Sequence, residues 1–206
     1  MRVSVVGYQG DVEEHVNTLK KAGDKLGLDC EVLPTRDPDV VAHSDGVVLP
    51  GGESTTISRL IFSHHISPQI IKLAHRGCPV MGTCAGMILL AKHGDEQVKR
   101  TGTKLLELMD IMVKRNAFGR QRESFQVELD IKGIGNIDAV FIRGPAITET
   151  KSNVDVLSRF DSYVVAAQQE NLLALAFHPE LTEDTRVQEY FLNMVKSWKD
   201  RPANDN

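Results

Sequence analysis

Residues 82–86 read GTCAG, so one cysteine, Cys84, stands between two glycines. A short apolar run at 79–81 precedes this stretch, and a helical pattern at 87–91 follows it. A strand, a sharp turn and a helix in that order expose a nucleophile at the start of the helix, where free N–H groups and the helix dipole favour a thiolate and a developing oxyanion. A buried structural cysteine is the alternative interpretation. The pattern favours Cys84 as a nucleophile, with the backbone N–H of Ala85 as a candidate oxyanion donor.

A histidine and a glutamate follow an apolar run near the end of the chain, where residues 174–180 read ALAFHPE. Residues two apart in a strand share a face, so His178 and Glu180 project together if the strand continues past Pro179. A carboxylate beside an imidazole fixes its tautomer and stabilises the imidazolium. A strand-end histidine and a solvated loop acid are the separate alternatives. Together with the cysteine, however, the two residues complete a nucleophile, a base and an orienting group, which predicts a Cys84–His178–Glu180 triad.

Length and composition are typical of one α/β domain. The chain has 206 residues, of which 41% are hydrophobic, and a net charge of −4. No basic stripe points to nucleic acid or an anionic membrane, and no apolar run reaches membrane-spanning length. The first residues read as a strand rather than a signal peptide, and three scattered cysteines argue for a reducing compartment. We expect a cytoplasmic protein with one folded unit at 1–199 and a flexible tail at 200–206.

The remaining histidines give no further site. No cysteine or histidine pair has the spacing of a zinc site, so we expect no metal. Six histidines lack a partner motif, and the sequence assigns them no role: His15, His43, His64, His65, His75 and His93.

Strand and helix patterns alternate in the first half of the chain and give way to strands in the second. Strands are expected at 2–7, 28–33, 45–49 and 79–82, and helices at 11–27, 54–63, 68–76 and after the cysteine. Asp11 and Ser54 are the expected helix caps. Later strands are expected at 125–131, 139–143, 154–160, 163–167 and 172–177, as antiparallel additions to a mixed sheet, and a last helix at 183–199. This order predicts a parallel sheet with helices on both faces.

The GTCAG and HPE motifs together resemble the class I glutamine amidotransferases. Four further stretches are similar to one branch of them, the glutaminase subunits of pyridoxal 5′-phosphate synthase: QGDVEEH at 9–15, PGGESTT at 50–56, RNAFGRQ at 115–121 and FIRGP at 141–145. The resemblance covers about residues 2–199. It implies a single-domain, flavodoxin-like amidotransferase fold with a mixed, mostly parallel central sheet flanked by helices. Two positions depart from the family pattern, which usually has alanine at Gly144 and an aliphatic residue at Tyr8.

The resemblance implies hydrolysis of L-glutamine to glutamate and ammonia through a thioester on Cys84. Gly52 would supply the second oxyanion N–H, because bare backbone can approach closely there. Glutamine carries an ammonium and a carboxylate. Glu53 is the candidate partner of the ammonium, and Arg115 and Arg143 are candidates for the carboxylate, because a guanidinium matches a carboxylate in a bidentate fork. Arg120 and Arg122 are left as surface or interface residues. In the family, the matching positions that line the glutamine site are Gly52, Glu53, Ser54, Arg115, Ile142 and Arg143.

The resemblance also implies a partner, the synthase subunit PdxS, a (β/α)8 barrel that receives the ammonia in a large hetero-oligomeric complex. Pyridoxal 5′-phosphate would be the product of that complex, so no cofactor is expected on this chain. Three alternatives remain: the glutaminase of another pathway, a non-catalytic redox or stress protein on a similar fold, and a module that only scaffolds the synthase. The RNAFGRQ stretch, the HPE segment and the intact triad speak against them in turn.

Overall fold

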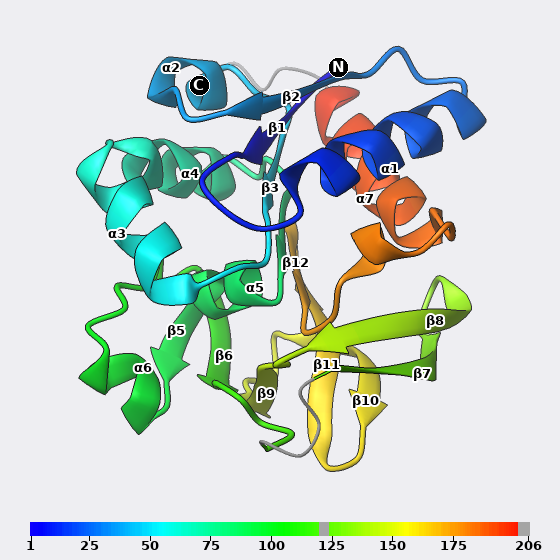
Figure 1. Ribbon diagram of the computed structural model, residues 1–206. Coiled ribbons are helices and arrows are strands. Elements are labelled where there is room, and N and C mark those ends of the chain that lie inside the picture. Colours follow the sequence, from blue (N-terminus) through cyan, green and yellow to red (C-terminus); the bar gives the residue numbers. More distant parts are fainter. Residues whose placement is uncertain (120–123, 202–206) are drawn as a thin grey trace.

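The computed structural model describes residues 1–119 and 124–201, so Arg120 and Arg122 lie outside the described residues. Most strands belong to one mixed sheet (Figure 1): β1 (Arg2–Val6), β2 (Glu31–Thr35), β3 (Gly46–Leu49), β4 (Val80–Thr83), β5 (Ala91–Gly94), β6 (Met109–Lys114), β9 (Ala146–Thr150), β10 (Asp155–Phe160), β11 (Tyr163–Gln169) and β12 (Leu172–Leu175). Their order is β2-β1-β3-β4-β12-β11-β9-β6-β5, and β10 pairs with β11.

The centre of this sheet is parallel. The pairs β1–β2, β1–β3, β3–β4 and β4–β12 all run in the same direction, whereas β11 pairs antiparallel with β12, β9 and β10. Every residue of β3, β4 and β12 is buried, as expected of strands covered on both faces, and this explains their continuous apolar runs. The predicted mixed, mostly parallel sheet is confirmed.

Helices cover both faces of the parallel strands. In Figure 1, α1 (Val12–Lys25) and α7 (Arg186–Lys199) lie on one side of β1 and β3, and α3 (Ser54–Ser63) and α4 (Ile66–His75) lie on the other. The short elements are α2 (Pro38–Ala42), α5 (Ala85–Leu90), α6 (Glu96–Arg100) and the 3-10 turn η1 (Pro179–Leu181). Among the described residues, no helix has the length and apolar character needed to span a membrane.

Two helix starts differ from the sequence expectation. Asp11 stands at the N-cap of α1, but its side chain makes no capping hydrogen bond and lies instead 3.6 Å from Nδ1 of His178. Glu53, not Ser54, caps α3, because its carboxylate accepts from the backbone N–H groups of Thr55 at 3.1 Å and Thr56 at 2.7 Å. Asp11 therefore belongs to the surroundings of His178, whereas Glu53 takes over the capping of α3.

The second half also departs from the expectation. β7 (Ser124–Ile131) and β8 (Gly135–Ile142) do not join the main sheet but form a separate two-stranded antiparallel sheet. Within the hairpin, the ring of Phe141 stacks on that of Phe125 with centroids 4.7 Å apart. Tilted ring contacts attach the hairpin to the main sheet, because the Phe141 centroid lies 6.0 Å from that of Phe160 and 5.8 Å from that of Phe177. The chain has few aromatic residues, and gathering them here substitutes ring packing for a hydrogen-bonded ladder.

Candidate active site

Three neighbouring parallel strands end at the site. β3 leads into Gly51 and Gly52, β4 into Cys84, and β12 into His178, and their registers pair Leu49 with Gly82 and Thr83 with Leu175. The carboxyl ends of adjacent parallel strands meet at one edge of the sheet, where ligands bind in open α/β folds. The sheet topology therefore brings together residues that are almost a hundred positions apart.

Cys84 occupies a strained turn between β4 and α5. Its φ is 49° and its ψ is −104°, a conformation that non-glycine residues rarely adopt. The flanking glycines make the turn possible: a Cβ on Gly82 would lie 2.6 Å from the backbone of Gly86, and one on Gly86 would overlap the carbonyl oxygen of Leu49. The predicted elbow is present, and both glycines are required by close backbone approach.

His178 and Glu180 form a buried hydrogen-bonded pair. Nδ1 of His178 lies 2.7 Å from Oε1 of Glu180, and both residues are less than 5% exposed. The reason predicted for this pairing was wrong, because the strand does not continue past Pro179. Instead Pro179–Leu181 forms η1, and this tight turn folds the carboxylate back onto the ring. The backbone N–H of His178 is held by the carbonyl of Val140 at 2.8 Å.

The pKa values of His178 and Glu180 are shifted in opposite directions. Burial opposes the charged form of His178 and is the largest influence, but the neighbouring Cys84 and the hydrogen bond and charge of Glu180 outweigh it and raise the pKa to about 10. Burial also opposes the Glu180 carboxylate, but the two histidines, His15 and His178, lower its pKa to about 2. The pair is therefore an imidazolium and a carboxylate at neutral pH.

The Nε2 edge of His178 remains free for the reaction. Nε2 is buried without a hydrogen-bond partner in the part of the chain that the structure describes, and Sγ of Cys84 lies 3.8 Å from the carbonyl oxygen of Ile142. We interpret the influence of Cys84 on the His178 pKa as attraction between neighbouring groups, since no formed Sγ–Nε2 hydrogen bond is present. An imidazolium with a free N–H edge is able to protonate a leaving group.

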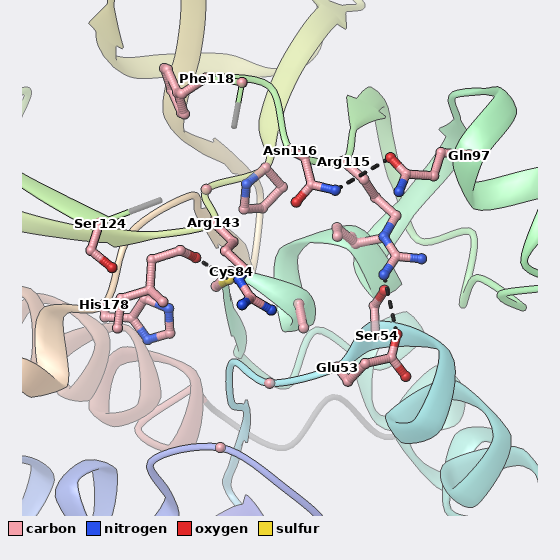
Figure 2. Close-up of a pocket in the computed structure, with 18 of the residues that line it drawn as sticks. Glu53, Ser54, Cys84, Gln97, Arg115, Asn116, Phe118, Ser124, Arg143 and His178 are labelled. Carbon is pink, nitrogen blue, oxygen red and sulfur yellow. Dashed lines mark hydrogen bonds and ion pairs between the residues drawn. The ribbon is translucent and has the colours of Figure 1, made fainter. Parts of the chain in front are cut away.

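A cavity of about 1630 Å³ contains almost all of the predicted site residues. Glu180 is the exception, because it lies buried behind His178. Figure 2 shows labelled side chains of this set around the same space. The predicted residues that line the cavity are Gly52, Glu53, Ser54, Cys84, Ala85, Arg115, Ile142, Arg143 and His178. The cavity far exceeds the volume of one amino acid, and its outer wall is formed by α6 and the chain around Phe118.

Glu53 and Arg115 contact each other in this structure. Nη2 of Arg115 lies 3.1 Å from Oε1 of Glu53, and Nη1 donates to the hydroxyl groups of Thr55 and Thr101. Burial opposes the Glu53 carboxylate, but its bonds to Thr56 and Thr55 outweigh that effect and lower its pKa to about 2. A charged acid and a charged base therefore stand at one end of the cavity.

Arg143 and Ser54 have features that suit a binding role. Arg143 has a φ of 46°, a strained backbone that places it directly after β8 on the cavity wall. Ser54 is 2% exposed, and its hydroxyl has no hydrogen-bond partner within residues 1–119 and 124–201. An unsatisfied buried hydroxyl costs free energy unless a ligand pairs with it.

The loop after β3 packs against the catalytic base. A Cβ on Gly51 would lie 2.5 Å from Cε1 of His178, and one on Gly10 would overlap the carbonyl oxygen of Gly51. Gly52 has a φ of 120°, and Oε1 of Gln9 accepts from the N–H of Glu53 at 3.2 Å. Residues 9–10 thus brace the loop that was predicted to supply an oxyanion donor.

The two positions that depart from the family pattern, Tyr8 and Gly144, contact identified neighbours. The Tyr8 hydroxyl is 2.8 Å from Nδ1 of His64, which joins the end of β1 to the end of α3. A Cβ on Gly144 would lie 3.0 Å from Phe141 and 3.1 Å from Phe118, so an alanine there requires the rings to shift. Neither residue contacts the triad.

Sequence reasoning missed the groups that face Glu180 and His178 from the start of α1. His15, to which the sequence assigned no role, is fully buried with Nε2 3.3 Å from Oε1 of Glu180. Asp11 approaches His178 from the cavity side. Ligand-type atoms of Asp11, His178 and Glu180 lie within 4.8 Å of one another, but the Glu180 oxygen already accepts from His178. We therefore interpret the group as a base with its carboxylates, and the absence of a metal stays a prediction.

The sequence matches the family model described as the SNO glutamine amidotransferase family over residues 5–197. The pyridoxal 5′-phosphate synthase subunit PdxT of Archaeoglobus fulgidus is 64% identical over 194 residues, which cover 94% of this chain and 98% of that protein. The PdxT subunit of Geobacillus kaustophilus is 46% identical over 200 residues, 97% of each chain.

Solved structures agree with these relatives. A crystal structure of a glutamine amidotransferase matches with a TM-score of 0.83 at 38% identity, over 94% of this chain and 98% of that chain. A glutamine amidotransferase from Thermotoga maritima matches with a TM-score of 0.60 at 15% identity, over 98% of this chain and 86% of that chain, and shares the fold. The chain, with its elbow cysteine and buried His–Glu pair, belongs to the SNO glutamine amidotransferase family.

Proposed function

We propose that this chain is the glutaminase subunit of a pyridoxal 5′-phosphate synthase and hydrolyses L-glutamine to glutamate and ammonia. The observation that carries the proposal is the meeting of the strained Cys84 turn with the buried His178–Glu180 pair at one cavity. The names of the PdxT relatives support the pathway.

The proton of Cys84 is already held by His178 as the imidazolium, and the Cys84 sulfur attacks the side-chain amide carbon of glutamine as a thiolate. A carbon–sulfur bond forms, and the carbonyl oxygen becomes an oxyanion. His178 then protonates the leaving nitrogen from Nε2, the carbon–nitrogen bond breaks, and ammonia departs from a glutamyl thioester. Glu180 keeps the ring in the orientation that points Nε2 toward the sulfur.

Water hydrolyses the thioester in the second half of the reaction. His178, now neutral, takes a proton from the water, which attacks the thioester carbon and releases glutamate. We assign the oxyanion to the backbone N–H groups of Ala85 and Gly52. Ala85 directly follows the nucleophile, and Gly52 stands at the end of the adjacent strand with a φ that only glycine adopts easily.

Opposite charges on the cavity wall select free glutamine. We assign the ammonium to Glu53 and the carboxylate to Arg115 and Arg143, with Ser54 and Ile142 completing the walls. The Glu53–Arg115 contact has to open or widen when glutamine enters, because each partner then gains a substrate group. Replacing the Glu53–Arg115 ion pair by two ion pairs with the substrate costs little free energy, because every charged group still has a partner.

Ammonia is useful only if it reaches the synthase before it escapes to water. We propose that the PdxS barrel docks over the cavity and that docking turns the Gly51–Gly52 peptide into the oxyanion site. All three cysteines are free, which suits a cytoplasmic protein. We place the folded domain at 1–199; of the tail expected at 200–206, residues 202–206 lie outside the described residues.

Glutamate release from glutamine, measured with synthase titrated in, tests the function. We expect the rate to rise with added synthase, since one missing oxyanion donor costs about 10²–10³-fold in kcat. Cys30→Ser is the matched control, because Cys30 is a free thiol outside the cavity. A wild-type complex that releases no glutamate, or a Cys84→Ser complex that does, contradicts the proposal.

A further inference from the structure

His15 is a buried polar residue that the glutaminase mechanism leaves without a task. It lies on the first turns of α1 and is 0% exposed. Its Nε2 is 3.3 Å from Oε1 of Glu180 and 3.1 Å from Oγ1 of Thr83. Thr83 is the last residue of β4, directly before the nucleophile. One ring nitrogen thus contacts both the orienting carboxylate and the residue next to Cys84.

The chemistry of the contacts fixes the proton on that nitrogen. A carboxylate can only accept hydrogen bonds, so Nε2 of His15 has to carry the hydrogen that faces Glu180. Nδ1 has no hydrogen-bond partner among the described residues. The Nε2–H therefore lies against both groups, hydrogen-bonded to the threonine hydroxyl and in ion-pair contact with the carboxylate.

We propose that His15 is a positioning residue that holds Glu180 and the end of β4 in fixed relation, so that His178 and Cys84 stay aligned. The proposal rests on the glutaminase function above. Oε1 of Glu180 accepts a hydrogen bond from His178 at 2.7 Å and has Nε2 of His15 as an ion-pair partner at 3.3 Å, while Oε2 has no hydrogen-bond partner among the described residues. Without His15, the carboxylate is held by the catalytic base alone, and rotation of Glu180 turns that base.

The other charged groups around Glu180 make this support necessary. Asp11 faces the same pair from the loop before α1, and its charge repels the Glu180 carboxylate, while Glu14 in turn repels Asp11. The attractive partners of Glu180 are His15 and His178. Removing His15 leaves a buried carboxylate with a like charge nearby and one donor, which weakens its hold on the imidazolium.

Three substitutions separate positioning from packing. His15→Leu removes the donor and keeps an apolar group of similar size. His15→Gln restores a donor, because the glutamine amide nitrogen is as many bonds from Cβ as Nε2 of histidine. His15→Asn places its amide one bond shorter, at the Nδ1 position, and serves as the matched control for polarity. Leu19→Val, on the same buried face of α1, is the control for packing alone.

We expect His15→Leu to lower kcat of the synthase complex by about 10–100-fold, the range that outer hydrogen-bond partners of a site commonly carry, with KM for glutamine unchanged. His15→Gln should recover most of the wild-type kcat, and His15→Asn should not. Leu19→Val should lower the melting temperature and leave kcat unchanged. If His15→Leu does not fold, the comparison of the Gln and Asn variants decides the question.

The rate of Cys84 alkylation by iodoacetamide, followed by the mass of its peptide, gives a readout without glutamine. We expect slower alkylation in His15→Leu and a wild-type rate in His15→Gln, because a weaker imidazolium supports less thiolate. A wild-type kcat and alkylation rate in His15→Leu overturn the inference, as does an equal loss in the Gln and Asn variants. If the wild-type complex has no glutaminase activity, the proposed function fails, and the alkylation rates still decide the role of His15.

Discussion

Replacing Gly51 by alanine tests whether the catalytic base has to lie against bare backbone. A Cβ at this position would lie 2.5 Å from Cε1 and 3.2 Å from Nδ1 of His178, whereas ordinary contacts begin at 3.4 Å. The ring would have to move by about 1 Å, but its hydrogen bond to Glu180 anchors it. A misplacement of about 1 Å commonly costs about 10²-fold in rate, which corresponds to about 2.7 kcal/mol.

The expected result is a fall of about 10²-fold in kcat with a small change in KM, because the base moves while the binding groups do not. The measurement is steady-state glutamate release by the synthase complex, with melting temperatures recorded for each subunit. Gly7→Ala is the matched control, since its Cβ would meet the backbone of Thr35 at an ordinary 3.6 Å. A Gly51→Ala subunit that keeps the wild-type kcat refutes the reasoning, and so does a Gly7→Ala subunit that loses as much.

Three further predictions concern the nucleophile, the groups that bind the substrate carboxylate and the pH dependence of stability. Cys84→Ser should abolish glutamine hydrolysis yet leave pyridoxal phosphate formation from ammonium salts intact in the complex; loss of both activities contradicts a role confined to the amide. Arg115→Ala or Arg143→Ala should raise KM for glutamine by an amount equivalent to about 2–5 kcal/mol, because an unpaired carboxylate is left in the cavity; unchanged KM in both variants contradicts their role in binding the substrate. Stability should be highest between about pH 4.5 and 6.5. The lowered pKa of Glu180 makes its contribution vanish as the pH falls from 4.5 toward about 2, and the raised pKa of His178 makes its contribution vanish as the pH rises from 6.5 toward about 10. Melting temperature across this range is the measurement, and Glu180→Gln should flatten its acidic side.

Much of the fold could be predicted from the sequence because its signals are local. The apolar runs of β1, β3 and β4 and the amphipathic pattern of α7 are set by burial on one or both sides. The second strand was expected at 28–33 but lies at Glu31–Thr35, after the chain leaves α1 through a turn at Gly27. Short elements such as α2, β5 and α6 were missed, because four or five residues carry too little periodicity.

The parts of the site that escaped prediction depend on contacts between distant segments. The elbow and the HPE segment are readable because each is contiguous. His15 is identified only when α1 packs beside η1, and no pattern within α1 distinguishes it from a core histidine. The two unexpected helix starts have the same cause. Asp11 faces the buried His178 and does not cap α1, whereas Glu53 keeps its bonds to the N–H groups at the start of α3, and neither choice can be read from the local sequence.

The β7–β8 hairpin and the main sheet carry different parts of the site. The hairpin's ladder is its own, and its end contributes Ile142 and the adjacent Arg143 to the cavity, whereas Cys84 and His178 follow strands of the main sheet. Amide cleavage therefore resides in the main sheet, and one part of the substrate wall is built separately, on the hairpin. A change in hairpin length or sequence can alter which molecule enters while the main ladder stays intact, provided that Val140 still holds the backbone of His178. Sequence changes confined to the β7–β8 hairpin can therefore alter its part of the substrate wall without altering the Cys84 turn or the parallel strands that hold it.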